Sequence, residues 1–129
     1  MTHLLDTDRF VDYLNDRGDS RAVLAPLVRR GVVATSAIVL AEIYEGLIRD
    51  PKADAKTAVI DEVLAGSHVY GIDDVTARRF ASLRHALRTS GLLINDHDIW
   101  IAATALEHDL TLISRDRHFD RIPNLKLLR

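Results

Sequence analysis

Four acidic residues stand near the ends of predicted strands or the starts of predicted helices: Asp6, Glu42, Asp98 and Asp116. In an open α/β sheet, ligands bind at the edge formed by the carboxyl ends of the strands, so these carboxylates should meet there. Crowded carboxylates repel and raise one another's pKa unless a cation lies among them. Ligands that are all oxygen suit Mg²⁺ or Mn²⁺, and such a site can activate water for attack at phosphorus. The pattern therefore predicts metal-assisted hydrolysis of a phosphate ester.

Each aspartate also has a purely structural interpretation. The stretch "INDHDIWIAATAL" places Asp96 and Asp98 at the start of an apolar helix. Either residue could be an N-cap that accepts backbone N–H bonds and is favoured by the helix dipole. Glu42 lies beyond capping reach of Ser36, so its ordinary alternative is a solvated or ion-paired side chain. The sequence leaves both interpretations open.

Other catalytic chemistries find little support in the sequence. There is no cysteine, which excludes disulfides, thiolate catalysis and cysteine–zinc sites. The six histidines show no paired metal-binding motif. His97, which lies between two acids, is the only one that we retain as a possible participant.

The elements that must position the acids follow from the hydrophobic pattern. Short apolar runs alternate with helical patterns, which is typical of an α/β fold with a mainly parallel sheet. Strands are expected at residues 3–5, 32–36, 68–72, 110–114 and 125–128. Helices are expected at residues 7–18, 20–31, 37–50, 53–66 and 75–91, and a last one is opened by Asp96 or Asp98. Ser36 and either Asp73 or Asp74 are the expected N-caps of two helices.

Composition limits the class of protein. A chain of 129 residues with 47% hydrophobic residues fits one domain over residues 1–129. A net charge of −2 argues against non-specific attraction to nucleic acid or to an anionic membrane, so any polyanion must be held locally. With no signal sequence and no apolar run of membrane-spanning length, we expect a cytoplasmic protein.

One predicted helix is strongly basic. Between Val75 and Gly91 the sequence has four arginines and no acid: Arg78, Arg79, Arg84 and Arg88. These side chains could form a solvated face, or they could bind the phosphates of a nucleic acid without reading its bases.

Three stretches carry a resemblance to a known family. "LLDTDRFVDYL", "TSAIVLAEIYEGL" and "INDHDIWIAATALEHDLTLISRDRHFDRI" resemble, in order and spacing, the motifs of PIN-domain ribonucleases, and most closely the VapC-like toxins of bacterial toxin–antitoxin pairs. The resemblance covers nearly the whole chain. It implies a three-layer α/β/α sandwich around a mainly parallel sheet, and an endoribonuclease that hydrolyses RNA phosphodiester bonds with Mg²⁺ or Mn²⁺.

The resemblance also assigns roles to individual residues. Asp6, Glu42, Asp98 and Asp116 match the four family acids and would bind the metal, with a metal-activated water as the nucleophile. Asp8 and Asp96 have no fixed place in that set and would be accessory. Ser114 matches a small hydroxyl residue beside the fourth acid, and it would orient a ligand or a water molecule.

Three other functions remain as alternatives. "LLDTD" after a strand also resembles the first motif of haloacid-dehalogenase phosphatases, and a receiver-like signalling module has similar length and acids. Both expect a lysine near the phosphate, whereas this chain has only Lys52, Lys56 and Lys126. The third alternative is a catalytically silent PIN-like binding module, although none of the four acid positions departs from the pattern.

The resemblance implies partners as well. Toxins of this type are homodimers controlled by a VapB-like antitoxin. Apolar side chains of one helix could form such interfaces: Ile43, Tyr44, Leu47 and Ile48. We therefore expect a homodimer through the first half of the chain and, beside it, a groove for an amphipathic antitoxin helix, with an antitoxin arginine near the carboxylates. The simpler alternative is that these side chains pack onto the sheet.

Overall fold

The computed structural model describes all residues, 1–129. Five strands form its sheet: β1 (His3–Leu5), β2 (Val33–Ser36), β3 (His68–Tyr70), β4 (Thr111–Ile113) and β5 (Leu127–Leu128). Six α-helices and one 3₁₀ helix connect them: α1 (Thr7–Leu14), α2 (Ser20–Arg29), α3 (Ala37–Leu47), α4 (Ala53–Ala65), α5 (Asp74–Thr89), α6 (Asp96–Glu107) and η1 (Arg117–Arg121).

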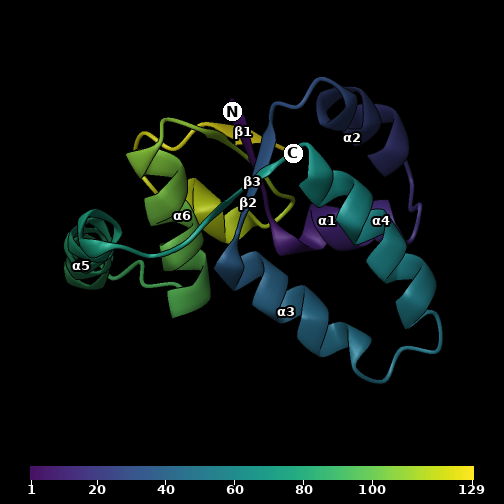
Figure 1. The fold of residues 1–129 in the computed structure, drawn as a ribbon. Coiled ribbons are helices and arrows are strands. Elements are labelled where there is room, and N and C mark those ends of the chain that lie inside the picture. The colour runs from purple at the N-terminus through teal and green to yellow at the C-terminus, as the bar shows by residue number, and fades with distance from the viewer.

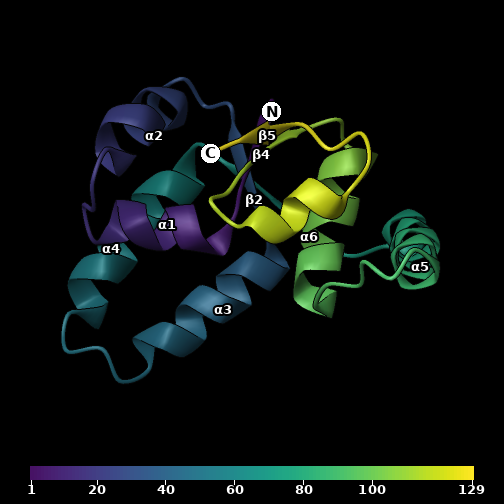
Figure 2. The ribbon, with the colours of Figure 1, turned by 180° about the vertical axis from the view of Figure 1, so that it is seen from behind.

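The strand order is β3-β2-β1-β4-β5, and every neighbouring pair is parallel. The chain first adds strands on one side of β1 and then returns to add β4 on the other. Because crossovers between parallel strands are right-handed, this reversal places α5 and α6 on the opposite face of the sheet from α1, α2 and α4. Figures 1 and 2 show these two groups of helices on either side of the strands. The predicted three-layer α/β/α architecture is confirmed.

Several predicted elements are shorter in the structure. The strand predicted to reach residue 72 ends at Tyr70, and the one predicted at 125–128 is only Leu127–Leu128. Helix α1 ends at Leu14 rather than near Gly18, because Asp16 and Gly18 adopt left-handed φ values of 52° and 54° that a helix cannot contain. The strands that precede Asp6 and Asp116, β1 and β4, are nonetheless in the predicted places.

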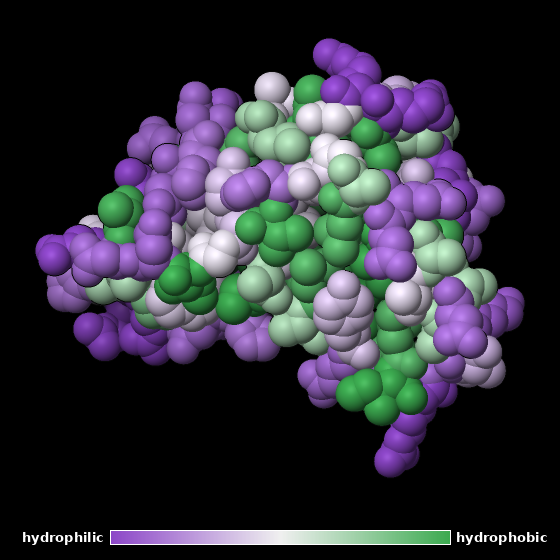
Figure 3. Space-filling model, viewed as in Figure 1, coloured by the Kyte–Doolittle hydropathy of each residue, from purple (hydrophilic) through white to green (hydrophobic).

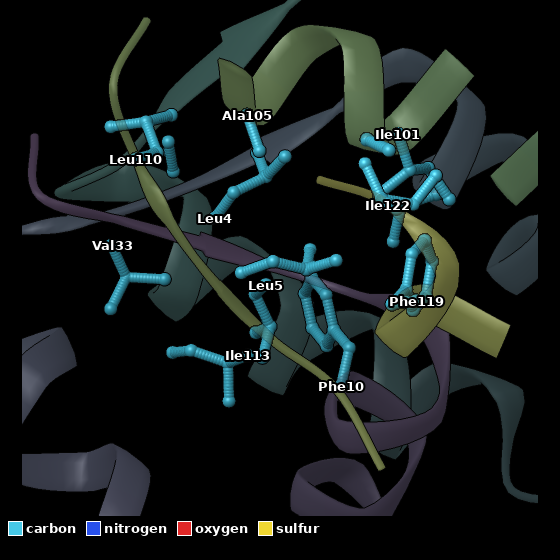
Figure 4. Packing of buried hydrophobic residues seen from close by; sticks show 14 of the residues in the cluster. Leu4, Leu5, Phe10, Val33, Ile101, Ala105, Leu110, Ile113, Phe119 and Ile122 are labelled. Carbon is cyan, nitrogen blue, oxygen red and sulfur yellow. The ribbon is translucent and has the colours of Figure 1, made fainter. Parts of the chain in front are cut away.

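Helix α6 is buried on almost every side, as its apolar sequence predicted. Small residues let it lie close to the sheet: Ala102, Ala103 and Ala105 are all fully buried. Figure 4 shows Phe10 of α1 near Leu5 and Ile113 of the central strands. Because both faces of the sheet are covered, the ends of β1 and β4 are held rigidly.

The N-caps of α3 and α5 are as predicted, whereas the N-cap of α6 is a different residue. Ser36 caps α3 by accepting the Val39 N–H, and Asp73 caps α5 with a reciprocal bond to Thr76. The cap of α6, however, is Asn95, whose side chain accepts the Asp98 N–H at 2.9 Å. The expectation that Asp96 or Asp98 is an N-cap is therefore wrong, and both carboxylates are available for other contacts.

None of the helices combines the length and the apolar character needed to cross a membrane.

Candidate active site

A cavity of about 310 Å³ opens at the carboxyl ends of the strands, and we call it the acid pocket. It is lined by Asp6, Thr7, Asp8, Glu42, Asn95, Asp98 and Asp116, none of which is hydrophobic. The structure thus brings together all four acids singled out in the sequence, together with the accessory Asp8. Asp96 does not line the pocket, and neither does any lysine. The lysine that a phosphatase or a receiver-like module requires is therefore missing from this pocket.

The acid pocket lies where the strand order reverses. β1 is the first strand of the chain and β4 the fourth, and they pair with Leu5 opposite Ile113. The backbone continues this pairing, because the Asp6 N–H donates to the Ile113 carbonyl at 3.0 Å. In open α/β sheets the crevice at such a reversal is the usual ligand site.

Ser114 connects two of the acids. Its hydroxyl donates to Asp6 Oδ2 at 2.7 Å, and its Oγ accepts the Asp116 N–H at 3.1 Å. Ser114 is fully buried. It therefore fixes the Asp6 carboxylate relative to the loop that carries Asp116, instead of facing a ligand directly.

Asn95 holds the third acid. Its side-chain oxygen accepts the Asp98 N–H, while its Nδ2 donates to Asp98 Oδ2 at 2.7 Å. Sequence reasoning missed this residue, although an asparagine directly before an acidic first turn is a recognisable N-cap signal.

Two histidines lie at the rim of the acid pocket. His118 Nδ1 is 3.4 Å from Asp116 Oδ1 and 3.9 Å from Asp98 Oδ2. One ligand atom from each of Asp98, Asp116 and His118 lies within 4.8 Å of the other two. His97 lies beside Glu42, with 3.6 Å between Nδ1 and Oε1. His97 was considered from the sequence, whereas His118 was missed because nothing in its local sequence pairs it with Asp98.

The acids disturb one another's ionisation. The pKa of Asp6 is raised from 3.8 to about 7, first by burial and then by the charges of Asp8 and Asp98, against the lowering effect of the Ser114 hydrogen bond. The pKa of Asp98 is also raised, by burial and by the charges of Asp116 and Glu42. A divalent cation among these oxygens would relieve the repulsion, so the donor set fits Mg²⁺ or Mn²⁺.

The four arginines of α5 do not form the uninterrupted basic stripe that the sequence suggested. Arg78 is paired with Asp74 at 2.8 Å, and Arg84 with Asp96 at 2.9 Å. Arg79 borders a separate, half-apolar cavity, and Arg88 is exposed without an ion pair. Asp96 therefore neutralises an arginine of α5 beside the acid pocket instead of lining that pocket.

Comparison with known proteins identifies the family and the fold. The PIN-domain family matches residues 3–125. The chain is 31% identical to "Ribonuclease VapC2" of Rickettsia felis, over 98% of this chain and 96% of that protein. The solved structure of VapBC2 from the same organism, bound to a DNA fragment from their promoter, has a TM-score of 0.86 at 29% identity and covers 99% of this chain and 98% of that one.

A further solved structure comes from a member of the VapBC family of toxin–antitoxin systems, VapBC-5 from Mycobacterium tuberculosis. It has a TM-score of 0.71 at 26% identity and covers 99% of this chain and 98% of the other. An acid pocket at the reversal point of a parallel sheet, on a chain with these relatives, defines the class of protein. The chain belongs to the PIN-domain family and, within it, to the VapC ribonuclease toxins.

Proposed function

We propose that the acid pocket binds Mg²⁺ or Mn²⁺ and hydrolyses RNA phosphodiester bonds as an endoribonuclease in the cytoplasm, and that the chain is the toxin of a pair with its own antitoxin. The observation that carries this proposal is the meeting of Asp6, Glu42, Asp98 and Asp116 in one cavity without a hydrophobic side chain. Burial, with a smaller contribution from the neighbouring carboxylates, raises the pKa of Asp6 to about 7, so at neutral pH this group keeps a proton or needs a cation beside it.

The metal would be held by these four carboxylates. When bound, it supplies charge neutralisation at the phosphate and lowers the pKa of water, which is the chemistry that phosphodiester hydrolysis needs. The remaining contributions come from the chain itself. Ser114 and Asn95 orient the carboxylates of Asp6 and Asp98, and Asp8 accepts the Arg115 N–H at 2.9 Å, which fixes the loop after β4.

The substrate must be held beside a negatively charged pocket. Arg84 is fixed next to the first turn of α6 by Asp96, and Arg79 and Arg88 make no ion pair. Arg78 pairs only with the exposed Asp74, so all four arginines remain candidates for binding the RNA backbone. Contacts of this kind would position the strand without selecting its sequence.

The groove between α1, α3 and α4 is our proposed antitoxin site. It is lined by apolar side chains such as Val11, Leu14 and Leu47, and Glu42 of the acid pocket also borders it. An amphipathic helix lying there could therefore place an arginine near the carboxylates.

We also propose a homodimer that uses α3. Ile43 is buried in the core and is unavailable, which corrects one of the residues expected at this surface. Ile48 and Tyr44 are 78% and 44% exposed. Figure 3 shows hydrophobic side chains at the surface over the C-terminal end of α3. Large exposed apolar patches usually mark an interface.

The decisive experiment is incubation of the purified protein with mixed RNA in Mg²⁺, in Mn²⁺ and in chelator. We expect cleavage with either metal and none in chelator, and Asp98→Ala should abolish it while the circular dichroism spectrum stays unchanged. Asp74→Ala, an exposed carboxylate paired only with Arg78, is the matched control and should cleave normally. Cleavage that survives in Asp98→Ala would refute the assignment, and a wild-type protein that never cleaves RNA would support the silent binding module.

A further inference from the structure

A second polar cavity, of about 370 Å³, lies beside the acid pocket, and we call it the arginine pocket. It is lined by Arg9, Asp12, Arg17, Gly18, Asp19 and Arg115. These residues come from α1, from the loop between α1 and α2, and from the loop after β4. Like the acid pocket, it has no hydrophobic lining residue.

A hydrogen bond joins the linings of the two cavities. The backbone N–H of Arg115 donates to Asp8 Oδ2 at 2.9 Å, and Asp8 lines the acid pocket. The side chain of Arg115 points the other way, to Asp12 in the arginine pocket. A ligand that extends out of the acid pocket over Asp8 would therefore reach the arginine pocket next.

Both oxygens of the Asp12 carboxylate accept hydrogen bonds from Arg115. Arg115 binds it through two hydrogen bonds, from Nε at 2.8 Å and from Nη2 at 3.1 Å. Arg9 is left with longer contacts, 3.5 Å from Nη1 to Asp12 and 3.4 Å from Nη2 to Asp19.

Arg9 is therefore a buried cation with incomplete pairing. It is only 5% exposed, and its Nε has no hydrogen-bond partner. Its second acid, Asp19, has a side chain that is 72% exposed to water and so pairs weakly. Because a buried guanidinium is costly unless it is well paired, an added anion in this cavity would stabilise it.

The charge of the arginine pocket favours such an anion. Arg9, Arg17 and Arg115 outnumber Asp12 and Asp19, and Arg17 makes no ion pair. Guanidinium groups match phosphate oxygens in geometry as well as in charge. No apolar side chain lines the cavity, so it offers nothing to anchor a peptide.

We propose that the arginine pocket is a phosphate subsite, which holds the RNA phosphate next to the one in the acid pocket. The subsite rests on the proposed ribonuclease function, because the same strand would occupy both cavities. The subsite would bind the RNA backbone on the α1 side of the acid pocket. The sequence had indicated backbone contacts only from α5.

Arg17→Gln is the variant that tests the subsite, because Arg17 is exposed and its loss should not disturb folding. Arg29→Gln is the matched control, an exposed arginine of α2 outside every cavity and ion pair. Affinity for a fluorescent single-stranded RNA would be measured by anisotropy at several salt concentrations, in the Asp98→Ala background so that the RNA stays intact. KM and kcat would be measured in the wild-type background.

For Arg17→Gln we expect roughly tenfold weaker RNA binding, a salt-dependence slope smaller by about 0.7, and a raised KM with little change in kcat. Arg29→Gln should match the unmodified protein. Arg9→Gln should show the same loss of affinity, provided that its melting curve shows it folded.

Equal RNA affinity and equal salt slopes for Arg17→Gln and Arg29→Gln would overturn the subsite while leaving cleavage by the acid pocket intact. A loss of antitoxin binding without any loss of RNA binding would overturn it too, since the cavity would then recognise an acidic peptide. If the wild-type protein cleaves no RNA in either metal, the proposed function itself fails, and the subsite with it.

Discussion

Asp6 is the residue in which the conflict between folding and function is clearest. It is 5% exposed, receives a hydrogen bond from Ser114, and faces two other carboxylates. A buried acid with a pKa near 7 opposes the fold once it is ionised, because the unfolded chain ionises more easily. The position is therefore better explained by ligand binding than by stability.

This conflict predicts a pH dependence. Because the pKa of Asp6 rises from 3.8 in the unfolded chain to about 7 in the fold, the contribution of Asp6 to the free energy of unfolding should decrease between about pH 4 and pH 7 and then level off. Asp6→Asn should remove that decrease. Urea unfolding of both proteins in chelator at a series of pH values measures it, and parallel curves for the two would contradict the assignment.

At the residue scale, the sequence predicted the four acids but only part of their surroundings. Asp6, Asp98 and Asp116 could be selected because each stands near a strand or helix boundary, and Glu42, inside its helix, by its place in the family motif. Ser114 was also singled out, through the resemblance, but its bond to Asp6 could not be predicted. Neither could the Arg115–Asp12 bond, since each joins residues more than 100 positions apart. His118 likewise lies next to Asp98 only in the fold, although its other contact, with Asp116, is local in the sequence.

At the element scale, the start of α6 serves stability and chemistry together. Asn95 closes the first turn through its oxygen and holds Asp98 through its nitrogen. The predicted helix was in the right place, but only Asp96 and Asp98 had been considered as its cap. Residues 95–98 are four polar residues in succession, and Asn95, directly before the acidic first turn, is the one that adopts the extended backbone of a cap.

Two substitutions of Asn95 separate these roles. Asn95→Ala should cost about 1 kcal/mol of stability and also reduce cleavage, because both contacts are lost. Asn95→Asp keeps the cap oxygen but loses the donor to Asp98, so it should retain most of the stability and still lose activity. Thermal melts and RNA cleavage rates measure the two effects.

Asp73→Ala is the control for the substitutions at Asn95. It removes the cap of α5, whose Thr76 bonds Glu107 at the opposite end of α6 from Asp98. We expect a similar loss of stability with unchanged cleavage. If Asn95→Asp cleaved RNA as fast as the wild type, the contact to Asp98 would have no catalytic importance.

At the scale of the whole molecule, the acid pocket should couple metal binding to stability. Mg²⁺ or Mn²⁺ that binds only the folded state should raise the melting temperature progressively with concentration. The rise should be larger at pH 8 than at pH 6, because Asp6 must lose its proton to bind the metal. Calorimetry at both pH values tests this. A melting temperature that stays unchanged in millimolar Mg²⁺ or Mn²⁺ would contradict the proposed metal site.

The proposed homodimer can be tested by substitution at its interface. Ile48→Arg places a charge on an exposed apolar side chain directly after α3 and should convert a dimer into a monomer without loss of helix content. Ile72→Arg, the same change at an exposed isoleucine outside α3, should leave the dimer intact. Light scattering gives the mass, and a wild-type monomer at all concentrations would refute the interface.

The pairing of β1 with β4 has a consequence for synthesis of the protein. Leu5 and Ile113 are neighbours in the sheet, so the edge that carries Asp6 and Asp116 cannot assemble until nearly all of the 129 residues have been translated. Such long-range pairing also forms slowly. A nascent chain on the ribosome therefore has no assembled nuclease site, and the translation machinery completes this toxin before the toxin can act on RNA.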